Sequence, residues 1–123
     1  MNELSIENNI KKLVNKIISK KTRNSENIRE IDYDILMQIL KQNSDAVLVD
    51  VRSPQEHAER KISPSINIPL YELNSKAESL LPNKDIPIIL YCQAGMRSIK
   101  AYMILKEKGY TNLYTLKGGL DNI

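Results

Sequence analysis

Two short apolar runs constrain the fold of this 123-residue chain more than any other feature of its sequence. They are "AVLVDV" at 46–51 and "IPIIL" at 86–90. A half-exposed strand alternates apolar with polar side chains, whereas a strand that is covered on both faces can be apolar at every position. The two runs therefore predict parallel strands inside a sheet that has helices on both faces.

Further apolar runs alternate with helical patterns from Ile28 onward. The other predicted strands are "IREI" (28–31), "SINIP" (65–69) and "NLYTL" (112–116), while the run at 86 extends through "IPIILYC" to residue 92. The helical patterns cover residues 32–42, 54–60, 71–81 and 96–108. Because parallel strands need crossover connections, the alternation predicts an α/β fold in which a five-stranded parallel sheet is sandwiched between helices.

Two helix boundaries have clear local signals. "SPQE", from Ser53 to Glu56, has the pattern of a capping box with proline at the first helical position, where a missing N–H costs nothing. Gly109 is placed to end the helix at 96–108 as a left-handed cap.

The composition limits what this chain can be. It has 123 residues, of which 41% are hydrophobic and 27% charged, and it lacks Trp and Phe. A single cysteine excludes an internal disulfide, and no His/Cys cluster has zinc-ligand spacing, so we expect no metal and no cofactor. No apolar run is long enough to span a membrane or to act as a signal peptide, and the cytoplasm is the expected compartment.

The net charge of +3 is concentrated at the N-terminus. Residues 1–31 carry seven Lys or Arg against four Glu, whereas residues 32–123 carry eleven charges of each sign. A neutral body is not typical of a nucleic-acid-binding domain. We expect residues 1–27 to form a basic amphipathic helix (4–20) with a linker, and residues 28–123 to form the main domain.

The apolar stripe of the expected N-terminal helix recurs at helical spacing and comprises Ile6, Ile10, Leu13, Val14, Ile17 and Ile18. This stripe has three interpretations. It packs on the domain in cis, it mediates dimerisation or the docking of a partner, or it lies on an anionic membrane surface.

Cys92 is the most informative residue, because it ends an apolar run and precedes "QAGMRS" and a helix. Sites in open parallel sheets form at the carboxyl ends of strands. The free amides and the dipole at a helix N-terminus favour an anion there, such as a thiolate. Gly95 allows the backbone to approach a ligand closely, and Arg97 supplies a permanent positive charge for an anionic substrate. These neighbours favour a nucleophilic role for Cys92 over simple filling of the core.

Four stretches occur in the order of the motifs of the rhodanese-like domain, which the chain resembles from about Ile28 to Leu120: "VDVRSPQEH", "INIPL", "YCQAGMRS" and "KGYTNLYTLKGGL". The resemblance implies a sulfurtransferase that moves a sulfane sulfur from thiosulfate or a persulfide to cyanide or a thiol, through a persulfide on Cys92. It also implies a sulfur-carrier protein as a candidate partner. The loop that it assigns to substrate binding consists of Gln93, Ala94, Gly95, Met96, Arg97 and Ser98.

The length of this loop bears on the reaction. Four residues separate Cys92 from Arg97, as is typical of sulfurtransferases, whereas the related cell-cycle phosphatases and arsenate reductases have one residue more. The resemblance therefore favours sulfur transfer over chemistry on phosphate or arsenate. A binding or regulatory module without turnover is the other alternative, and the presence of Cys92 favours the enzyme.

The sequence departs from the family pattern outside the loop. Lys61 stands where the family usually has a histidine, His57 follows Glu56 where an aromatic residue is common, and the usual Trp and closing helix after the double glycine are missing. These departures bear on the shape of the pocket and on the choice of donor, which the sequence leaves open.

Other candidate residues receive supporting or structural roles. The resemblance implies that Asp50 and Arg52, at the carboxyl end of a strand, are mainly structural residues that pair with neighbours and steady the loops. Glu56 is expected to act as a capping residue. His57 is interpreted as a helix-surface residue rather than half of a Cys–His pair. Gly118-Gly119 is interpreted as a tight turn that ends the last strand.

Overall fold

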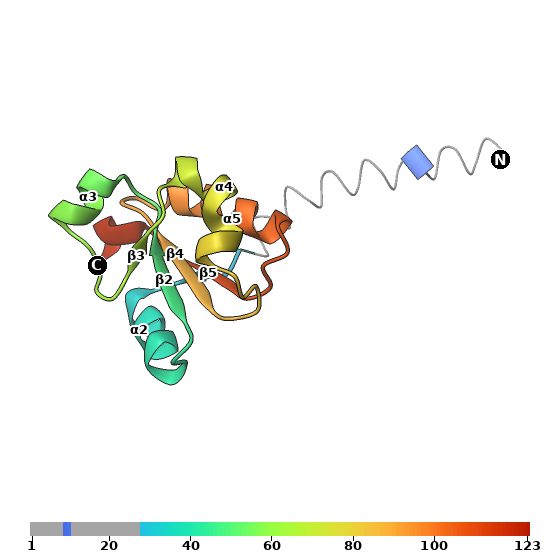
Figure 1. Cartoon of the computed structure of the whole chain (residues 1–123). Coiled ribbons are helices and arrows are strands. Elements are labelled where there is room, and N and C mark those ends of the chain that lie inside the picture. Colours follow the sequence, from blue (N-terminus) through green and yellow to red (C-terminus); the bar gives the residue numbers. More distant parts are fainter. Residues whose placement is uncertain (1–8, 11–27) are drawn as a thin grey trace.

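The computed structural model describes residues 9–10 and 28–123, and the latter form a single parallel sheet with helices on both faces (Figure 1). Its elements, in chain order, are β1 (Glu30–Ile31), α2 (Tyr33–Gln42), β2 (Val47–Asp50), α3 (Pro54–Glu59), β3 (Ile66–Asn67), α4 (Leu70–Leu80), β4 (Ile88–Tyr91), α5 (Met96–Glu107), β5 (Leu113–Leu116) and the 3₁₀ helix η1 (Gly119–Asn122). The predicted α/β class and the five-stranded parallel sheet are confirmed.

The five strands lie in the order β1-β5-β4-β2-β3, and every neighbouring pair is parallel. The two runs that predicted interior strands are β2 and β4, which pair with each other in the middle of the sheet, with Val49 opposite Leu90. The edge strands β1 and β3 keep only two residues each, fewer than their sequence patterns predicted. Each edge strand has a partner on one side only and pairs with it through two residues.

Both predicted helix boundaries are present. Ser53 and Glu56 form a reciprocal capping box at the start of α3, with Pro54 in the first turn. Gly109 takes a φ of +94° just after α5, where the Tyr110 N–H reaches the Leu105 carbonyl at 3.1 Å. This bond and the one from the Gly109 N–H to the Lys106 carbonyl form a Schellman motif.

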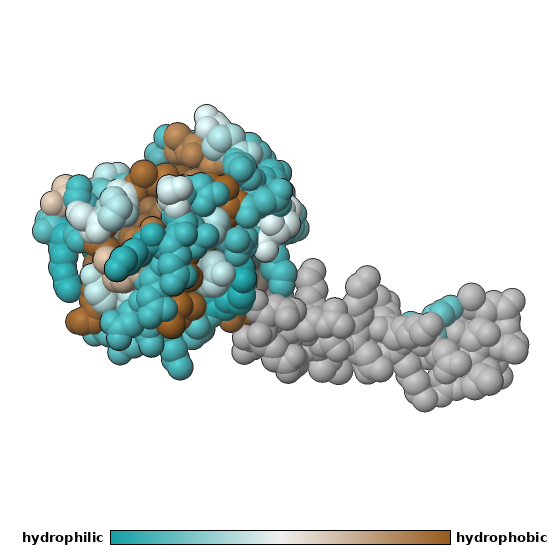
Figure 2. Space-filling view, turned by 90° about the horizontal axis from the view of Figure 1, so that it is seen from below, coloured by the Kyte–Doolittle hydropathy of each residue, from teal (hydrophilic) through white to brown (hydrophobic). Residues whose placement is uncertain are grey.

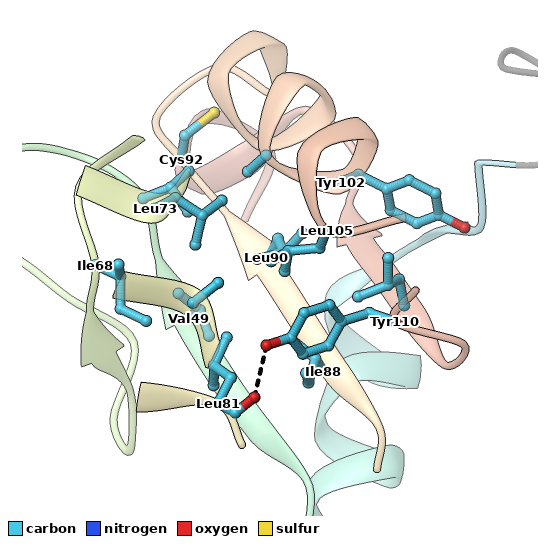
Figure 3. Packing of buried hydrophobic residues seen from close by; sticks show 14 residues of the cluster. Val49, Ile68, Leu73, Leu81, Ile88, Leu90, Cys92, Tyr102, Leu105 and Tyr110 are labelled. Carbon is cyan, nitrogen blue, oxygen red and sulfur yellow. Dashed lines mark hydrogen bonds between the residues drawn. The ribbon is translucent and has the colours of Figure 1, made fainter. Parts of the chain in front are cut away.

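Two apolar clusters, one on each face of the sheet, form the core. Successive residues of a strand point to opposite faces, so a strand covered on both sides supplies both clusters. The cluster beneath α4 and α5 includes Val49, Leu73, Leu90, Leu105 and Tyr110. Figure 3 shows these residues together, with the Tyr110 hydroxyl donating to the Leu81 carbonyl at 2.6 Å. The opposite cluster, beneath α2, includes Leu36, Leu48, Ile89, Tyr91 and Leu120.

The surface seen from below in Figure 2 mixes hydrophilic residues with separate hydrophobic patches. Helix α2 presents several partly exposed apolar side chains to solvent, namely Tyr33, Ile35 and Met37. In the described part of the chain, no helix is long and apolar enough to cross a membrane.

The expected N-terminal helix at 4–20 lies outside the described residues, except at Asn9 and Ile10. These two residues are helical, and the side chain of Ile10 is exposed. The three interpretations of the apolar stripe therefore stay predictions.

Candidate active site

Cys92 follows β4 directly and lies at the carboxyl end of the sheet's central strand (Figure 3). It is a free cysteine whose side chain is buried. Its Sγ accepts hydrogen bonds from the backbone N–H groups of Gly95, at 3.1 Å, and Ser98, at 3.3 Å. Helix α5 begins at Met96, so the sulfur lies at a helix N-terminus among backbone donors.

Gly95 shapes the turn that brings these donors to the sulfur. Its φ of +102° is a conformation that residues with a side chain rarely adopt. A Cβ at this position would also lie 3.3 Å from the backbone nitrogen of Gly118. The loop can therefore curl around Cys92 only because residue 95 is a glycine.

Ser98 ties the loop to the neighbouring strand. Its hydroxyl donates to the Gly95 carbonyl at 3.1 Å and accepts from the Thr115 hydroxyl of β5 at 2.9 Å. Its Oγ also lies 3.6 Å from Cys92 Sγ, which can donate to it as a thiol. Both Ser98 and Thr115 are fully buried, so these bonds are shielded from water and hold the loop in one shape.

Gly118 and Gly119 form the turn that we expected from the sequence. The backbone that follows them also packs against the loop after Cys92 and bonds to it. The Leu120 N–H donates to the Cys92 carbonyl at 3.0 Å, and the Asp121 N–H donates to the Gln93 carbonyl at 2.9 Å. A Cβ on Gly119 would come within 2.4 Å of the Cys92 carbonyl oxygen. The small size of residue 119 is therefore required by its contact with the loop. The only sign of this contact in the sequence was the pair of glycines at 118 and 119.

Arg97 points its guanidinium at α3 and forms a two-bond ion pair with Glu56. The Nη1–Oε1 and Nη2–Oε2 distances are 2.7 and 2.9 Å. The hydrogen bond from Arg97 lowers the pKa of Glu56 from 4.5 to about 2, and the same bond raises the pKa of Arg97. We predicted Glu56 only as a capping residue, but it has both roles, and the expected positive charge of Arg97 is already partnered.

Asp50 and Arg52 form a buried ion pair with each other at the end of β2. Arg52 reaches both carboxylate oxygens of Asp50, through Nε at 3.0 Å and Nη2 at 2.8 Å, and its Nη2 also donates to the Arg60 carbonyl. His57 was expected on the helix surface, yet its Nδ1 lies 2.9 Å from Asp50 Oδ2. His57 therefore belongs, with Asp50 and Arg52, to one hydrogen-bonded group of side chains.

Of the remaining loop residues, Gln93 is fixed by side-chain hydrogen bonds, whereas Ala94 and Met96 are exposed to solvent. The Gln93 side chain accepts from Arg52 Nη1 at 3.4 Å and donates to Asp121 Oδ1 at 2.6 Å. Ala94 is exposed, and Met96 is 69% exposed. The loop is thus anchored through Gln93, while Ala94 and Met96 stand at its open side. Among the described residues, no group of three His, Cys, Asp or Glu side chains could hold a metal ion.

Comparison with known proteins assigns the chain to a family. The family model of the rhodanese-like domain matches residues 32–123. The chain belongs to the rhodanese-like family. This match includes β2, the loop after Cys92 and the double glycine, and so covers the whole arrangement described above.

Individual relatives of this rhodanese-like chain include sulfurtransferases. A sulfurtransferase of Allochromatium vinosum is 31% identical over 93 residues, which cover 76% of this chain and 85% of the relative. The thiosulfate sulfurtransferase PspE of Escherichia coli is 37% identical over 75 residues, which cover 61% of this chain and 71% of PspE. A rhodanese of E. coli solved with anions superimposes with a TM-score of 0.58 at 36% identity, over 63% of this chain and 91% of that one.

Proposed function

We propose that this rhodanese-like protein transfers a sulfane sulfur from thiosulfate or a persulfide donor to cyanide or a thiol, with Cys92 as the nucleophile. One observation carries the proposal. Two backbone N–H groups, from Gly95 and Ser98, already point at Cys92 Sγ. Donors fixed in place before the reaction stabilise a negative sulfur without reorganisation. The family's sulfurtransferase relatives support the same reaction class.

The first half-reaction loads the enzyme. The Cys92 thiolate attacks the outer sulfur of thiosulfate, a new S–S bond forms, and the bond to the sulfonate sulfur breaks. Sulfite leaves with the electron pair of that bond. Thiosulfate brings two negative charges and sulfite removes two, so the enzyme keeps one negative charge, first on the thiolate and then on the persulfide. With a thiol persulfide as donor, the thiolate of the donor leaves in the same way.

The second half-reaction regenerates the thiolate. Cyanide, or the thiolate of an acceptor, attacks the outer sulfur of the Cys92 persulfide and leaves as thiocyanate or as a new persulfide. The sulfur of Cys92 takes back the electron pair. Because the resting and loaded states both carry one negative charge, the same backbone donors serve both of them.

The loop residues receive roles that follow from their positions. We assign the substrate-binding surface to Gln93, Ala94, Gly95, Met96, Arg97 and Ser98, with Asp50 and Arg52 as supporting residues behind it. The ion pair of Asp50 and Arg52 holds Gln93 in place through Arg52 Nη1. The exposed Ala94 and Met96 leave room at the mouth for an acceptor, which includes a sulfur-carrier protein as a candidate.

Steady-state assays test the proposal. We expect the full-length protein to form thiocyanate from cyanide with thiosulfate or a persulfide as donor, and we expect Cys92→Ser to abolish this activity. Serine is nearly isosteric with cysteine but cannot carry a persulfide. An inactive parent protein, or an active serine variant, would overturn the proposal. A parent that accepts sulfur without passing it on would support the alternative of a module without turnover.

A further inference from the structure

The ion pair between Arg97 and Glu56 occupies the side chain that the loop presents for an anionic substrate. Both terminal nitrogens of the guanidinium bond to the carboxylate, at 2.7 and 2.9 Å. The side chains of Arg97 and Glu56 are 38% and 33% exposed, so a small anion from solvent can reach both of them. A donor that needs Arg97 therefore meets a carboxylate already bound there.

Glu56 is held in this position from its own side as well. Its Oε1 accepts from the backbone N–H and from the hydroxyl of Ser53, both at 3.1 Å. These bonds belong to the capping box that starts α3. The carboxylate is thus fixed in front of the loop and is not a freely rotating surface charge.

The other arginine beside the loop offers no replacement charge. Arg52 is buried, and Asp50 occupies its Nε and one Nη. Arg52 and Arg97 are therefore each paired with a carboxylate.

Resting on the sulfur transfer proposed above, we infer that Glu56 is a specificity-determining residue that disfavours dianionic donors such as thiosulfate and so favours thiol persulfides. The sulfonate of thiosulfate must either displace Glu56 from Arg97 or lie beside a like charge. A thiol persulfide carries at most one charge on its transferable sulfur, which the backbone donors of Gly95 and Ser98 can accommodate without Arg97. Glu56 thereby acts through charge on the choice of donor and takes no part in bond making.

Anion binding tests this inference apart from turnover. Titration calorimetry with thiosulfate on the Cys92→Ser protein measures affinity where no sulfur can be transferred. We expect Glu56→Gln in that background to bind thiosulfate about tenfold more tightly. Glutamine keeps the shape of the side chain and can complete the capping box, so the start of α3 is preserved.

Glu59→Gln is the matched control. Glu59 lies on the same helix, and its substitution by Gln removes the same charge. It is exposed, and its side chain accepts a hydrogen bond from Gln55. Equal affinities in the Cys92→Ser protein with and without Glu56→Gln would overturn the inference. Equal tightening by Glu59→Gln would also overturn it, since the effect would then be one of net charge. Absence of thiosulfate binding in every variant would overturn it too.

Kinetics with intact Cys92 give the second readout. We expect Glu56→Gln to raise kcat/KM for thiosulfate about tenfold relative to kcat/KM for cysteine persulfide, mainly through a lower KM for thiosulfate. A parallel fall with both donors would show that Glu56 only positions the loop, and would contradict the inference. Failure of Cys92 to accept sulfur from any donor would instead overturn the proposed function, and the binding experiment would still decide the role of Glu56.

Discussion

At the scale of single residues, the charges around Cys92 are arranged as pairs, and backbone groups contact the sulfur itself. Asp50 and Arg52 form a buried pair, and Glu56 and Arg97 form a partly exposed one. A buried pair and an exposed pair respond differently to the loss of one partner. Removing one partner of a buried pair leaves an unpaired charge in the interior and lowers stability strongly. Removing one partner of an exposed pair costs little, because water screens the remaining charge.

Asp50→Ala tests the buried pair. The substitution leaves the guanidinium of Arg52 without its carboxylate in a site that is almost closed to solvent. We expect the free energy of unfolding to fall by about 3–5 kcal/mol, measured by denaturant titration. Glu78→Ala, which removes an exposed pair with Lys108, is the control and should have a much smaller effect. Equal effects of the two variants would contradict a structural role for Asp50.

Glu56 gives the pH dependence of stability. Its pKa is lowered from 4.5 to about 2 by Arg97, so the ion pair stabilises the fold above pH 4.5, and this contribution is lost as the pH falls toward 2. Because the carboxylate is 33% exposed, we expect a contribution of only about 1 kcal/mol. The unfolding free energies of the parent and of Glu56→Gln should differ by this amount at pH 7 and converge only as the pH falls through about 2. A difference that persists at low pH would contradict this assignment.

Residue roles were predictable from the sequence where they depend on neighbours in the chain. The capping box was predictable because Ser53 and Glu56 are three positions apart. A structural role for Asp50 and Arg52 came from the family resemblance, and their pairing with each other is a finding of the structure. The bond between Glu56 and Arg97 joins residues 41 positions apart, and no local pattern encodes it. The same holds for His57, whose partner Asp50 is brought close only by the turn into α3.

At the scale of elements, the ends of α2, α3, α4 and α5 were predicted to within one residue, because capping and periodicity are local properties. Strand lengths were less predictable, since the extent of β1 and β3 depends on how far each ladder continues with its neighbour. The backbone contact between η1 and the loop after Cys92 was not predicted. Its role depends on a contact between Gly119 and Cys92, which only the assembled sheet brings together.

Gly119→Ala tests whether the site needs the contact between η1 and the loop. The new Cβ would lie 2.4 Å from the Cys92 carbonyl oxygen, and the φ of +62° disfavours a side chain in any case. We expect loss of stability by about 2 kcal/mol or more, together with reduced sulfur loading on Cys92. Gly109→Ala is a matched control, because φ is +94° there but no atom lies within 4 Å of the added Cβ.

The control variant should lose only about 1 kcal/mol, from backbone strain, and should keep its sulfur loading. Unfolding titrations and intact-mass measurements on both variants provide the comparison. If Gly119→Ala loads sulfur as well as Gly109→Ala, the contact between η1 and the loop is not required for the site.

At the scale of the whole molecule, the parallel order of the sheet brings the site together. The strand order places β2, β4 and β5 side by side, so that the residues following β2 and β4 meet at one edge of the sheet. Parallel strands and their class were predictable from the continuous apolar runs. The strand order was not predicted, because it depends on long-range pairing that single-sequence patterns do not record.

Deletion of residues 1–24 tests the proposed division of the chain into residues 1–27 and 28–123. Both apolar clusters, all five strands and the loop lie within residues 28–123. We expect the shortened protein to fold and to load sulfur on Cys92. An unfolded product by circular dichroism would contradict the division.

The same deletion separates the three interpretations of the apolar stripe. Packing in cis, which we favour together with packing across a dimer, predicts a lower Tm with an unchanged solution mass. Packing across a dimer predicts a lower solution mass per particle after deletion. Vesicle binding by the full-length protein alone, with the Tm and mass unchanged by deletion, would contradict both and indicate a membrane-surface helix.

The central claim is that Cys92 carries the transferred sulfur, and intact-mass spectrometry of the full-length protein tests it most directly. The protein is incubated with thiosulfate or with cysteine persulfide, freed of donor and measured before and after addition of cyanide. We predict a gain equal to one sulfur atom, located on Cys92, that disappears with cyanide and never forms in Cys92→Ser. A protein whose mass stays unchanged with both donors, or a serine variant that gains the same mass, would contradict the account.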